Sequence, residues 1–429
     1  MGIDILLINL IIVTLIVIIL GFPISFCLGV GAVFYLIAND FPLSQAVSKL
    51  VFSVQSYTML AIPLFMLAGR LMNESKITDR IFDFANMLVG RVPGGLGQVN
   101  VVLSLIFSGM SGSALADVGG IGAMEIKAMK DKGYDEDFSV GITLASSVIG
   151  PIFPPSIPMV LFGIIAEVSI TGLFLGGILP GILISLMLMI YVFFVARRKK
   201  YYTSETYTFK QFAIAFLRAF PAILTPVIIV GGMTFGIFSP TEAATVSVLY
   251  AIFLSFIYRE LNFKTLWKVL EEVTISVSKL MFIIANALLF GWILTVGELT
   301  QQLSSVLTAA FDSPYMFLLL LNVALLILGA IIENAILLYI LAPMIAPIAQ
   351  QVFGIDPIHL GVVMVFNIMI GQFTPPMGLS LFLMRDITGH SLVRISKAVL
   401  PFLVPLIIGL LIITYIPIIV TFIPRALGF

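Results

Sequence analysis

Charged residues are scarce in this chain of 429 residues, in which Asp, Glu, Lys and Arg together account for 10%. Soluble globular proteins carry about 25% of such residues. Acidic and basic residues are equal in number, 22 of each, so the formal net charge is zero and a nucleic-acid partner is not expected. The one cysteine, Cys27, excludes an internal disulfide framework and a cysteine-based metal cluster.

Apolar residues replace the missing charges and make up 60% of the chain. A helix needs about 20 mostly apolar residues to cross a lipid bilayer. We therefore expect an all-α polytopic membrane protein. Its spans are predicted near residues 3–20, 22–38, 57–73, 136–167, 170–196, 218–237, 240–258, 279–297, 357–387 and 398–424.

Two apolar stretches, 96–129 and 313–351, are interrupted near their middles by small or polar residues. Each is predicted to be a re-entrant helical hairpin that enters and leaves the bilayer on one side. Residues 78–92 place apolar side chains at helical spacing among charges, which predicts an amphipathic helix at the membrane interface, and residues 263–278 have a similar pattern. Glu242, in the sequence Ser239-Pro-Thr-Glu, is predicted to belong to a helix N-terminal cap.

The positions of Lys and Arg predict the orientation of the chain. If the basic loop 197–200 is cytoplasmic, most other basic residues fall on the same side, and only Lys49 and Arg425 lie outside. Both termini are then expected outside the cytoplasm. The first hairpin enters from the cytoplasm, and the second enters from the opposite side.

The two halves of the chain resemble each other. Residues 133–155 superpose on 354–376 without a gap, and the matches include the glycines and the paired prolines. We therefore divide the chain into a first inverted repeat (1–200), a cytoplasmic linker (201–217) and a second repeat (218–429). Inverted repeats of this kind are typical of secondary transporters.

Each half carries a Gly-x-x-x-Pro-Pro break inside a long span, at 150–155 and 371–376. Proline has no backbone N–H and its ring clashes with the preceding turn, so carbonyls near each break are freed. Such groups must be satisfied internally in lipid, and a hard cation such as Na⁺ suits carbonyls and hydroxyls. A simple kink explains either break alone equally well. Two equivalent breaks, each beside a hairpin, favour a binding site.

The hairpin tips, 108–117 and 329–334, supply further polar groups. Their helix N-termini would present N–H groups to an anion, although packing of small residues alone also explains the Gly and Ser. Asp117 and Glu333 are the intramembrane acids that we single out for cation binding or protonation. A structural hydrogen bond within the protein is an equally good explanation of either.

These residues resemble the large membrane subunit of tripartite ATP-independent periplasmic (TRAP) transporters, over the whole chain. The matching motifs are SGSALAD (111–117), GPIFPPSIP (150–158), LFLGGILPG (173–181), SPTEAA (239–244) and GQFTPPMG (371–378). The resemblance implies an ion-transporter-superfamily fold in the bacterial inner membrane, with a scaffold and a transport domain that moves as an elevator, and it makes both termini periplasmic. It also implies Na⁺ coupling, a small four-helix membrane subunit, a periplasmic substrate-binding protein and an organic-acid substrate, with sialic acid and C4-dicarboxylates as common examples.

Carried onto this sequence, the family pattern implies two Na⁺ sites and one substrate site. The first Na⁺ site would use Ser108, Gly150, Phe153 and Pro155. The second would use Gly329, Gly371, Thr374 and Met377. Substrate would lie between the tips, near Ser111, Ser113, Ser156, Asn334 and Thr374. No arginine is expected at the depth of the tips, so helix dipoles and amides would hold the carboxylate.

We therefore expect Na⁺-coupled uptake of a small organic acid by a large TRAP subunit. An anion:sodium symporter of the same superfamily, working without a binding protein, is the alternative. An intramembrane enzyme is a remote one. Such an enzyme would need a nucleophile with a neighbouring base, or a group of metal ligands, at membrane depth. Neither His359 nor His390 has neighbours in the sequence that would form such a group.

Overall fold

The computed structural model describes residues 5–75, 77–201, 207–258, 260, 262–311, 313–376 and 378–429. Within them, six helices are long and apolar enough to cross a membrane, or up to seven if a bent pair of helices counts as one span. The regular structure of these residues is helical, so the expected all-α polytopic class is confirmed. Met377, assigned by the resemblance to the second Na⁺ site, lies outside the described residues.

The first half contains one helical hairpin and one broken helix. Its elements are α1 (Ile5–Ile19), α2 (Ile24–Ala38), α3 (Leu43–Val54), η1 (Tyr57–Leu60), α4 (Ala61–Glu74), α5 (Ile77–Val89), α6 (Gly95–Ser111), α7 (Ala114–Asp117), the π-helical turn η2 (Val118–Gly122), α8 (Ala123–Asp131), α9 (Glu136–Ser147), α10 (Ile157–Ile165) and α11 (Ile170–Lys199). Helix α6 and the returning limb α7–α8 form the hairpin predicted at 96–129. Helices α9 and α10 are the two parts of the broken span 136–167.

The second half repeats this order. Its elements are α12 (Phe209–Thr234), α13 (Pro240–Ile257), α14 (Phe263–Val296), α15 (Leu299–Ala310), α16 (Pro314–Gly329), α17 (Asn334–Gln351), α18 (Pro357–Gly371), α19 (Leu379–Thr388), α20 (Leu392–Tyr415) and α21 (Ile418–Ala426). Helices α16 and α17 form the hairpin predicted at 313–351, and α18 and α19 form the second broken helix. Both predicted hairpins and both predicted breaks are thus confirmed.

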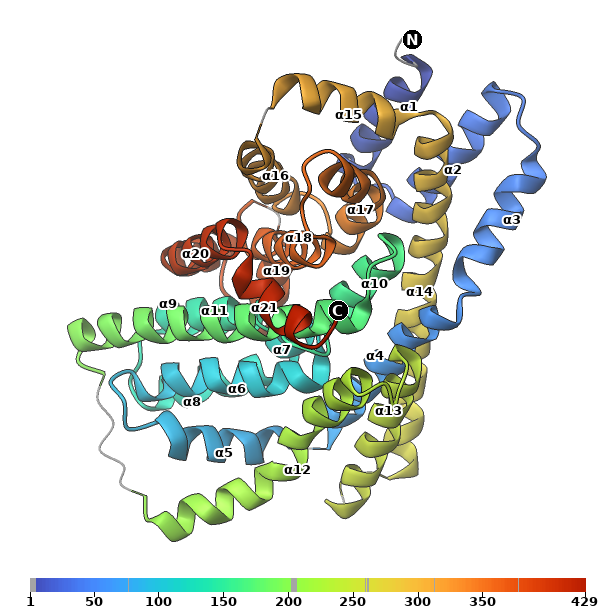
Figure 1. The fold of residues 1–429 in the computed structure, drawn as a ribbon. Helices are drawn as coiled ribbons and strands as arrows, with labels where there is room; N and C mark the ends of the chain where they lie inside the picture. Colours follow the sequence, from blue (N-terminus) through green and yellow to red (C-terminus); the bar gives the residue numbers. More distant parts are fainter. Residues whose placement is uncertain are drawn as a thin grey trace.

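Helix α14 differs from the sequence prediction. Residues 263–278 are not a separate interfacial helix, because they continue without interruption into the span predicted at 279–297. The chain has no proline in α14 and no glycine before Gly291 to end the first part. Its 34 residues extend about 51 Å, more than the ~30 Å hydrocarbon core of a bilayer. In Figure 1, α14 runs along one side of the molecule beside α2, α3 and α4.

The structure differs from the predicted helices at three further places. Residues 43–54, whose Ser and Lys side chains hide the apolar pattern, form α3, which meets the η1–α4 segment at a bend of 54°. The predicted span 398–424 ends at Tyr415, because Ile416 precedes a proline and leaves the helical conformation, and α21 follows. Helix α12 begins at Phe209, inside the segment predicted as a linker.

Local capping explains where several helices begin. Asp135 and Asp356 occupy equivalent positions in the two halves, and each carboxylate accepts a backbone N–H in the first turn of a broken helix. Ser239 and Glu242 form a reciprocal capping box at the start of α13. The capping role predicted for Glu242 is therefore confirmed.

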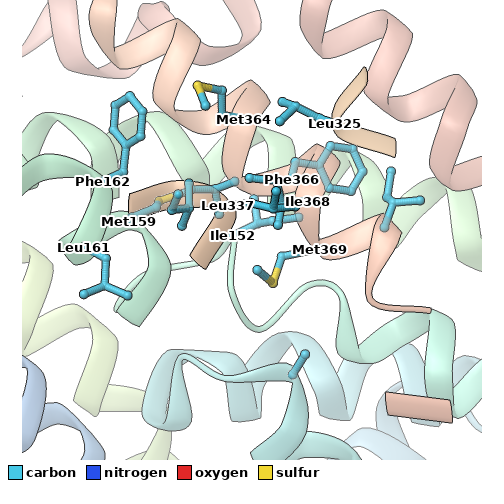
Figure 2. Packing of buried hydrophobic residues seen from close by; sticks show 14 of the residues in the cluster. Ile152, Met159, Leu161, Phe162, Leu325, Leu337, Met364, Phe366, Ile368 and Met369 are labelled. Atoms are coloured by element: carbon cyan, nitrogen blue, oxygen red, sulfur yellow. The ribbon is translucent and has the colours of Figure 1, made fainter. Parts of the chain in front are cut away.

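The largest apolar core extends through both halves and includes the space between the two broken helices. Helix α10 packs against α17 and α18, so the halves meet at their breaks. Figure 2 shows Ile152 and Met159 of the first half beside Leu337 and Ile368 of the second, all buried in one cluster. This shared core holds the two breaks close to each other and to the two hairpin tips.

Candidate functional site

The tip of the first hairpin rests directly on the first break. Gly112 has φ +58°, a left-handed conformation that favours glycine, and a Cβ added there would come within 2.3 Å of the Pro155 carbonyl oxygen. The backbone N–H of Ile157 donates to the Gly112 carbonyl at 3.4 Å. Gly150 lies against the other side of the tip, where its Cβ would be 3.3 Å from the Ser113 carbonyl carbon.

The second hairpin meets the second break in the same way. Gly329, at the end of α16, and Gly371, at the end of α18, are in backbone contact, since a Cβ added at Gly371 would lie 2.6 Å from the Gly329 carbonyl carbon. Asn334, the first residue of α17, donates its side-chain N–H to Gln372 Oε1 at 2.7 Å. The predicted residues Gly329, Gly371 and Asn334 are therefore brought together at one place.

Both breaks leave backbone carbonyls free. In the described part of the chain, the carbonyl oxygens of Gly150, Phe153 and Pro155 accept no hydrogen bond, and neither do those of Gly329 and Thr374. The Pro154–Pro155 and Pro375–Pro376 peptide bonds are both cis. An uncompensated carbonyl inside a membrane protein is costly unless an internal group or an ion satisfies it.

Two hydroxyls were also assigned to the Na⁺ sites, one on the first hairpin and one at the second break. Ser108 Oγ donates to the Leu105 carbonyl at 2.6 Å, and Thr374 Oγ1 donates to the Ile370 carbonyl at 2.9 Å. A hydroxyl that donates its only hydrogen keeps two lone pairs for another partner. Apart from Gly371, whose carbonyl already accepts the Thr374 N–H at 2.9 Å, the predicted and described members of each Na⁺ site thus have an oxygen with lone pairs free to bind a cation.

A cavity of 650 Å³ opens between the two tips. Ser113 and Asn334, both predicted to bind substrate, line it together with Gly112, Gly329 and Gln372. It has the volume expected of a small-molecule site, which is about 300–1,000 Å³. We call it the tip cavity.

The other predicted substrate residues lie outside the tip cavity. Ser111 lines an adjoining cavity of 580 Å³, to which Ser113 also contributes, and its buried hydroxyl has no hydrogen-bond partner among the described residues. Ser156 is fully buried, accepts from Met159 N and donates to the Pro151 carbonyl, so its hydroxyl caps α10. Thr374 lies at the second break.

The two acids singled out from the sequence have different surroundings. Asp117 is 2% exposed, and neither of its carboxylate oxygens has a hydrogen-bond partner among the described residues. Glu333 immediately precedes α17, makes no side-chain cap and lines the tip cavity. Only Glu333 therefore lies where it can meet a ligand between the tips.

Two cationic residues near the tips were missed by sequence reasoning. Arg70 of α4 lines the adjoining cavity with Ser111 and Ser113, although the sequence led us to expect no arginine at the depth of the tips. Lys279 of α14 lines the tip cavity itself. One signal could have found Lys279, because Glu272, Ser276 and Lys279 are spaced so that they share one face of a helix.

Sequence reasoning also missed a polar link between each hairpin and its broken helix. In the first half, Ser146 of α9 donates to Asn100 Oδ1 of α6 at 2.6 Å. In the second half, Asn367 of α18 donates to Asn322 Oδ1 of α16 at 2.7 Å. All four side chains are buried, so these bonds hold each hairpin limb in register with the helix that carries the break.

Comparisons with known proteins agree with this architecture. The chain is 42% identical to the sialic acid TRAP transporter large permease protein SiaM of Vibrio cholerae, over 92% of this chain and 93% of the relative. It is 42% identical to the sialic acid TRAP transporter permease protein SiaT of Haemophilus influenzae, over 97% of this chain and 68% of the relative. It is 40% identical to the C4-dicarboxylate TRAP transporter large permease protein DctM of Pseudomonas aeruginosa, over 93% of both chains.

Among solved structures, the YdaH transporter of Alcanivorax borkumensis shares the fold with a TM-score of 0.65. The sequence identity is 14%, and the match covers 87% of this chain and 89% of that one. Residues 11–419 match the family described as the tripartite ATP-independent periplasmic transporter, DctM component. This chain therefore belongs to the DctM family of TRAP transporter large permeases, and it is a transporter rather than an enzyme.

Proposed function

We propose that this permease takes up a small organic acid, of the sialic acid or C4-dicarboxylate class, with Na⁺ as the coupling ion. The free carbonyls at the two breaks carry this proposal. The ligands assigned to each site are carbonyls and hydroxyls, such as those of Gly150 and Thr374, which have no titratable group to take up a proton. An oxygen cage without a titratable group suits a metal cation.

The substrate class rests on the tip cavity and on the relatives. The returning limbs of the two hairpins begin at Ser113, the N-cap of α7, and at Asn334, the first residue of α17. Both residues line the cavity, and the backbone N–H groups at a helix N-terminus favour an anionic ligand. Relatives at about 40% identity are named for sialic acid and for C4-dicarboxylates. Both ligands are carboxylates of a size that suits 650 Å³.

We further propose that the two halves lie in opposite orientations in the inner membrane, with both termini in the periplasm. The hairpins and broken helices would form a transport domain that moves against a scaffold containing α4 and α14. A small membrane subunit and a periplasmic binding protein would complete the transporter. The relatives' names as TRAP permeases support this assembly.

Uptake by proteoliposomes tests the substrate and the partners. The chain is reconstituted with its small subunit, and the binding protein is added outside with labelled sialic acid or succinate. We expect uptake only when all three proteins are present. Full uptake without the binding protein would contradict the proposal and would support the binding-protein-independent symporter. Uptake of neither acid by the complete system would contradict the substrate class.

A further inference from the structure

We propose that Lys279 is the counter-charge for a single substrate carboxylate in the tip cavity, and that the site is therefore built for a monocarboxylate rather than a dicarboxylate. The inference rests on the proposed uptake of an organic acid and narrows its substrate class. It places a substrate-binding residue on α14, outside both hairpins and both broken helices.

The position of Lys279 shows that its side chain can reach a ligand between the tips. It lines the tip cavity on the same face of α14 as Ser276 and Ile283, opposite Ser113 and Asn334 of the two tips. Helix α14 packs against α4 and α17, so this face is held beside the tip of the second hairpin. A ligand bound between the tips is thus within the region that a flexible lysine side chain can sample.

The ion pairs around the two cavities distinguish Lys279 from the other basic residues nearby. Arg70, in the adjoining cavity, is neutralised by Glu272, whose carboxylate accepts from Nε at 3.1 Å and from Nη2 at 2.6 Å. Lys268 also pairs with Glu272, at 3.7 Å. Lys279, by contrast, forms no ion pair with any described residue. Of the Lys and Arg side chains that line the two cavities, Lys279 is therefore the one without an ion pair among the described residues.

Glu333 sets the limit on substrate charge. It lines the tip cavity too, and it makes no ion pair with Lys279. Lys279 and Glu333 leave the side chains of the cavity near neutrality. A first substrate carboxylate can be matched by Lys279, while a second would lie near Glu333 with no further Lys or Arg among the described residues that line the cavity. Both side chains are exposed, so no burial cost applies, but two carboxylates held close together in a site with much apolar lining repel each other. The charge pattern thus favours one carboxylate per substrate.

The test measures binding to the purified complex of both membrane subunits, without the binding protein. Thermal stabilisation is titrated with N-acetylneuraminic acid, with its uncharged methyl ester and with succinate. Lys279→Gln is expected to raise the half-maximal concentration for the acid by about tenfold or more, the usual effect of losing a hydrogen bond to a charged group. It should leave the ester unchanged. Lys279→Arg should keep most of the affinity, and the wild type should bind the acid more tightly than succinate.

Lys268→Gln is the matched control, because Lys268 lies on the same helix but is paired with Glu272 and lines neither cavity. Equal effects of Lys268→Gln and Lys279→Gln would overturn the inference, as would equal losses for acid and ester. Restoration of wild-type affinity in Lys279→Gln/Glu333→Gln would also overturn it, since Lys279 would then serve only to neutralise Glu333.

The inference and the proposed function fail differently. If the wild-type complex binds neither acid and the complete system takes up neither, the proposed function is contradicted. If the wild type binds the acid and Lys279→Gln binds it equally well, only the role of Lys279 is contradicted. If succinate binds as tightly as the monocarboxylate, the preference for a single carboxylate is contradicted.

Discussion

Gly329 and Gly371 touch backbone to backbone: a Cβ added at Gly371 would lie 2.7 Å from the Gly329 Cα and 2.6 Å from its carbonyl carbon. No side chain other than hydrogen fits there without displacing the main chain. The contact joins the tip of the second hairpin to the second break, where the second Na⁺ site is proposed. The proposed second Na⁺ site therefore requires that the contact between Gly329 and Gly371 be kept.

Gly371→Ala should separate this tip from its break. Overpacking of this kind costs about 1–3 kcal/mol, so we expect a lower thermal stability in detergent together with loss of Na⁺-dependent uptake. Gly231→Ala is the control, because a Cβ at Gly231 meets nothing within 4 Å. If both variants are as stable and active as the wild type, the close packing of tip and break is refuted.

Thr374→Val should weaken the second Na⁺ site. The Thr374 hydroxyl already donates to the Ile370 carbonyl, so its oxygen is free to accept a cation, and valine removes that oxygen. We expect the Na⁺ concentration for half-maximal uptake to rise about tenfold, as for loss of a polar contact to a charged partner.

Thr388→Val is the matched control for Thr374→Val. The Thr388 hydroxyl makes the same type of bond, to the Met384 carbonyl at 2.8 Å, but lies at the far end of α19. The Na⁺ dependence of this variant should match the wild type. An unchanged Na⁺ dependence of Thr374→Val would remove Thr374 from the site.

Motion of the first tip against α4 can be tested by cross-linking. A Cβ added at Gly69 would lie 3.0 Å from the Ser111 Cα, close enough for a disulfide between Gly69→Cys and Ser111→Cys in a Cys27→Ala background. An elevator predicts that oxidation stops uptake and that reduction restores it. The control pair is Gly97→Cys with Val192→Cys, which joins α6 to α11 and so does not involve the proposed scaffold helices α4 and α14. Normal uptake by the oxidised Gly69–Ser111 pair would contradict an elevator.

The sequence was informative where the chemistry is local. Paired prolines remove backbone donors in any environment, so both broken helices and the hairpins beside them could be predicted. The same applies to Glu242, because a capping box involves only residues of the first helical turn.

The sequence was less informative where tertiary contacts decide. Helix α14 was divided because charged residues such as Lys268 and Glu272 resemble an interfacial segment, although nothing in the backbone ends the helix there. Arg70 and Lys279 were missed as site residues because their approach to the tips depends on how α4 and α14 pack. Likewise, the contact of Gly329 with Gly371 joins residues of two different helices, α16 and α18, and no periodic pattern in the sequence predicts it.

The ion pair between Asp135 and Lys199 should make stability depend on pH outside the membrane core. Lys199 Nζ donates to Asp135 Oδ2 at 2.8 Å, and this bond lowers the pKa of Asp135. A lowered pKa in the folded state stabilises the protein above the unfolded pKa of aspartate, about 3.9, and this stabilisation is lost as the pH falls below it. Because both side chains are 44% exposed, the effect should stay within about 1 kcal/mol.

Thermal unfolding of the wild type and Asp135→Asn between pH 3 and pH 7, a range chosen around the aspartate pKa of about 3.9, measures this contribution. The gap between the two should be present near neutrality and should close on acidification. Asp131→Asn, which removes an exposed acid without an ion pair among the described residues, should match the wild type throughout. A gap that stays constant with pH would contradict the role of the pair.

The central claim is that cations at the two breaks drive uptake of an organic acid. The most direct measurement is uptake of labelled acid by proteoliposomes containing the complete system, with an inward gradient of Na⁺, of choline at equal ionic strength, or of protons alone. The account predicts accumulation only with the Na⁺ gradient, rising more steeply than a single-site curve because two ions bind. Undiminished uptake with choline, or uptake driven by protons alone, would contradict it.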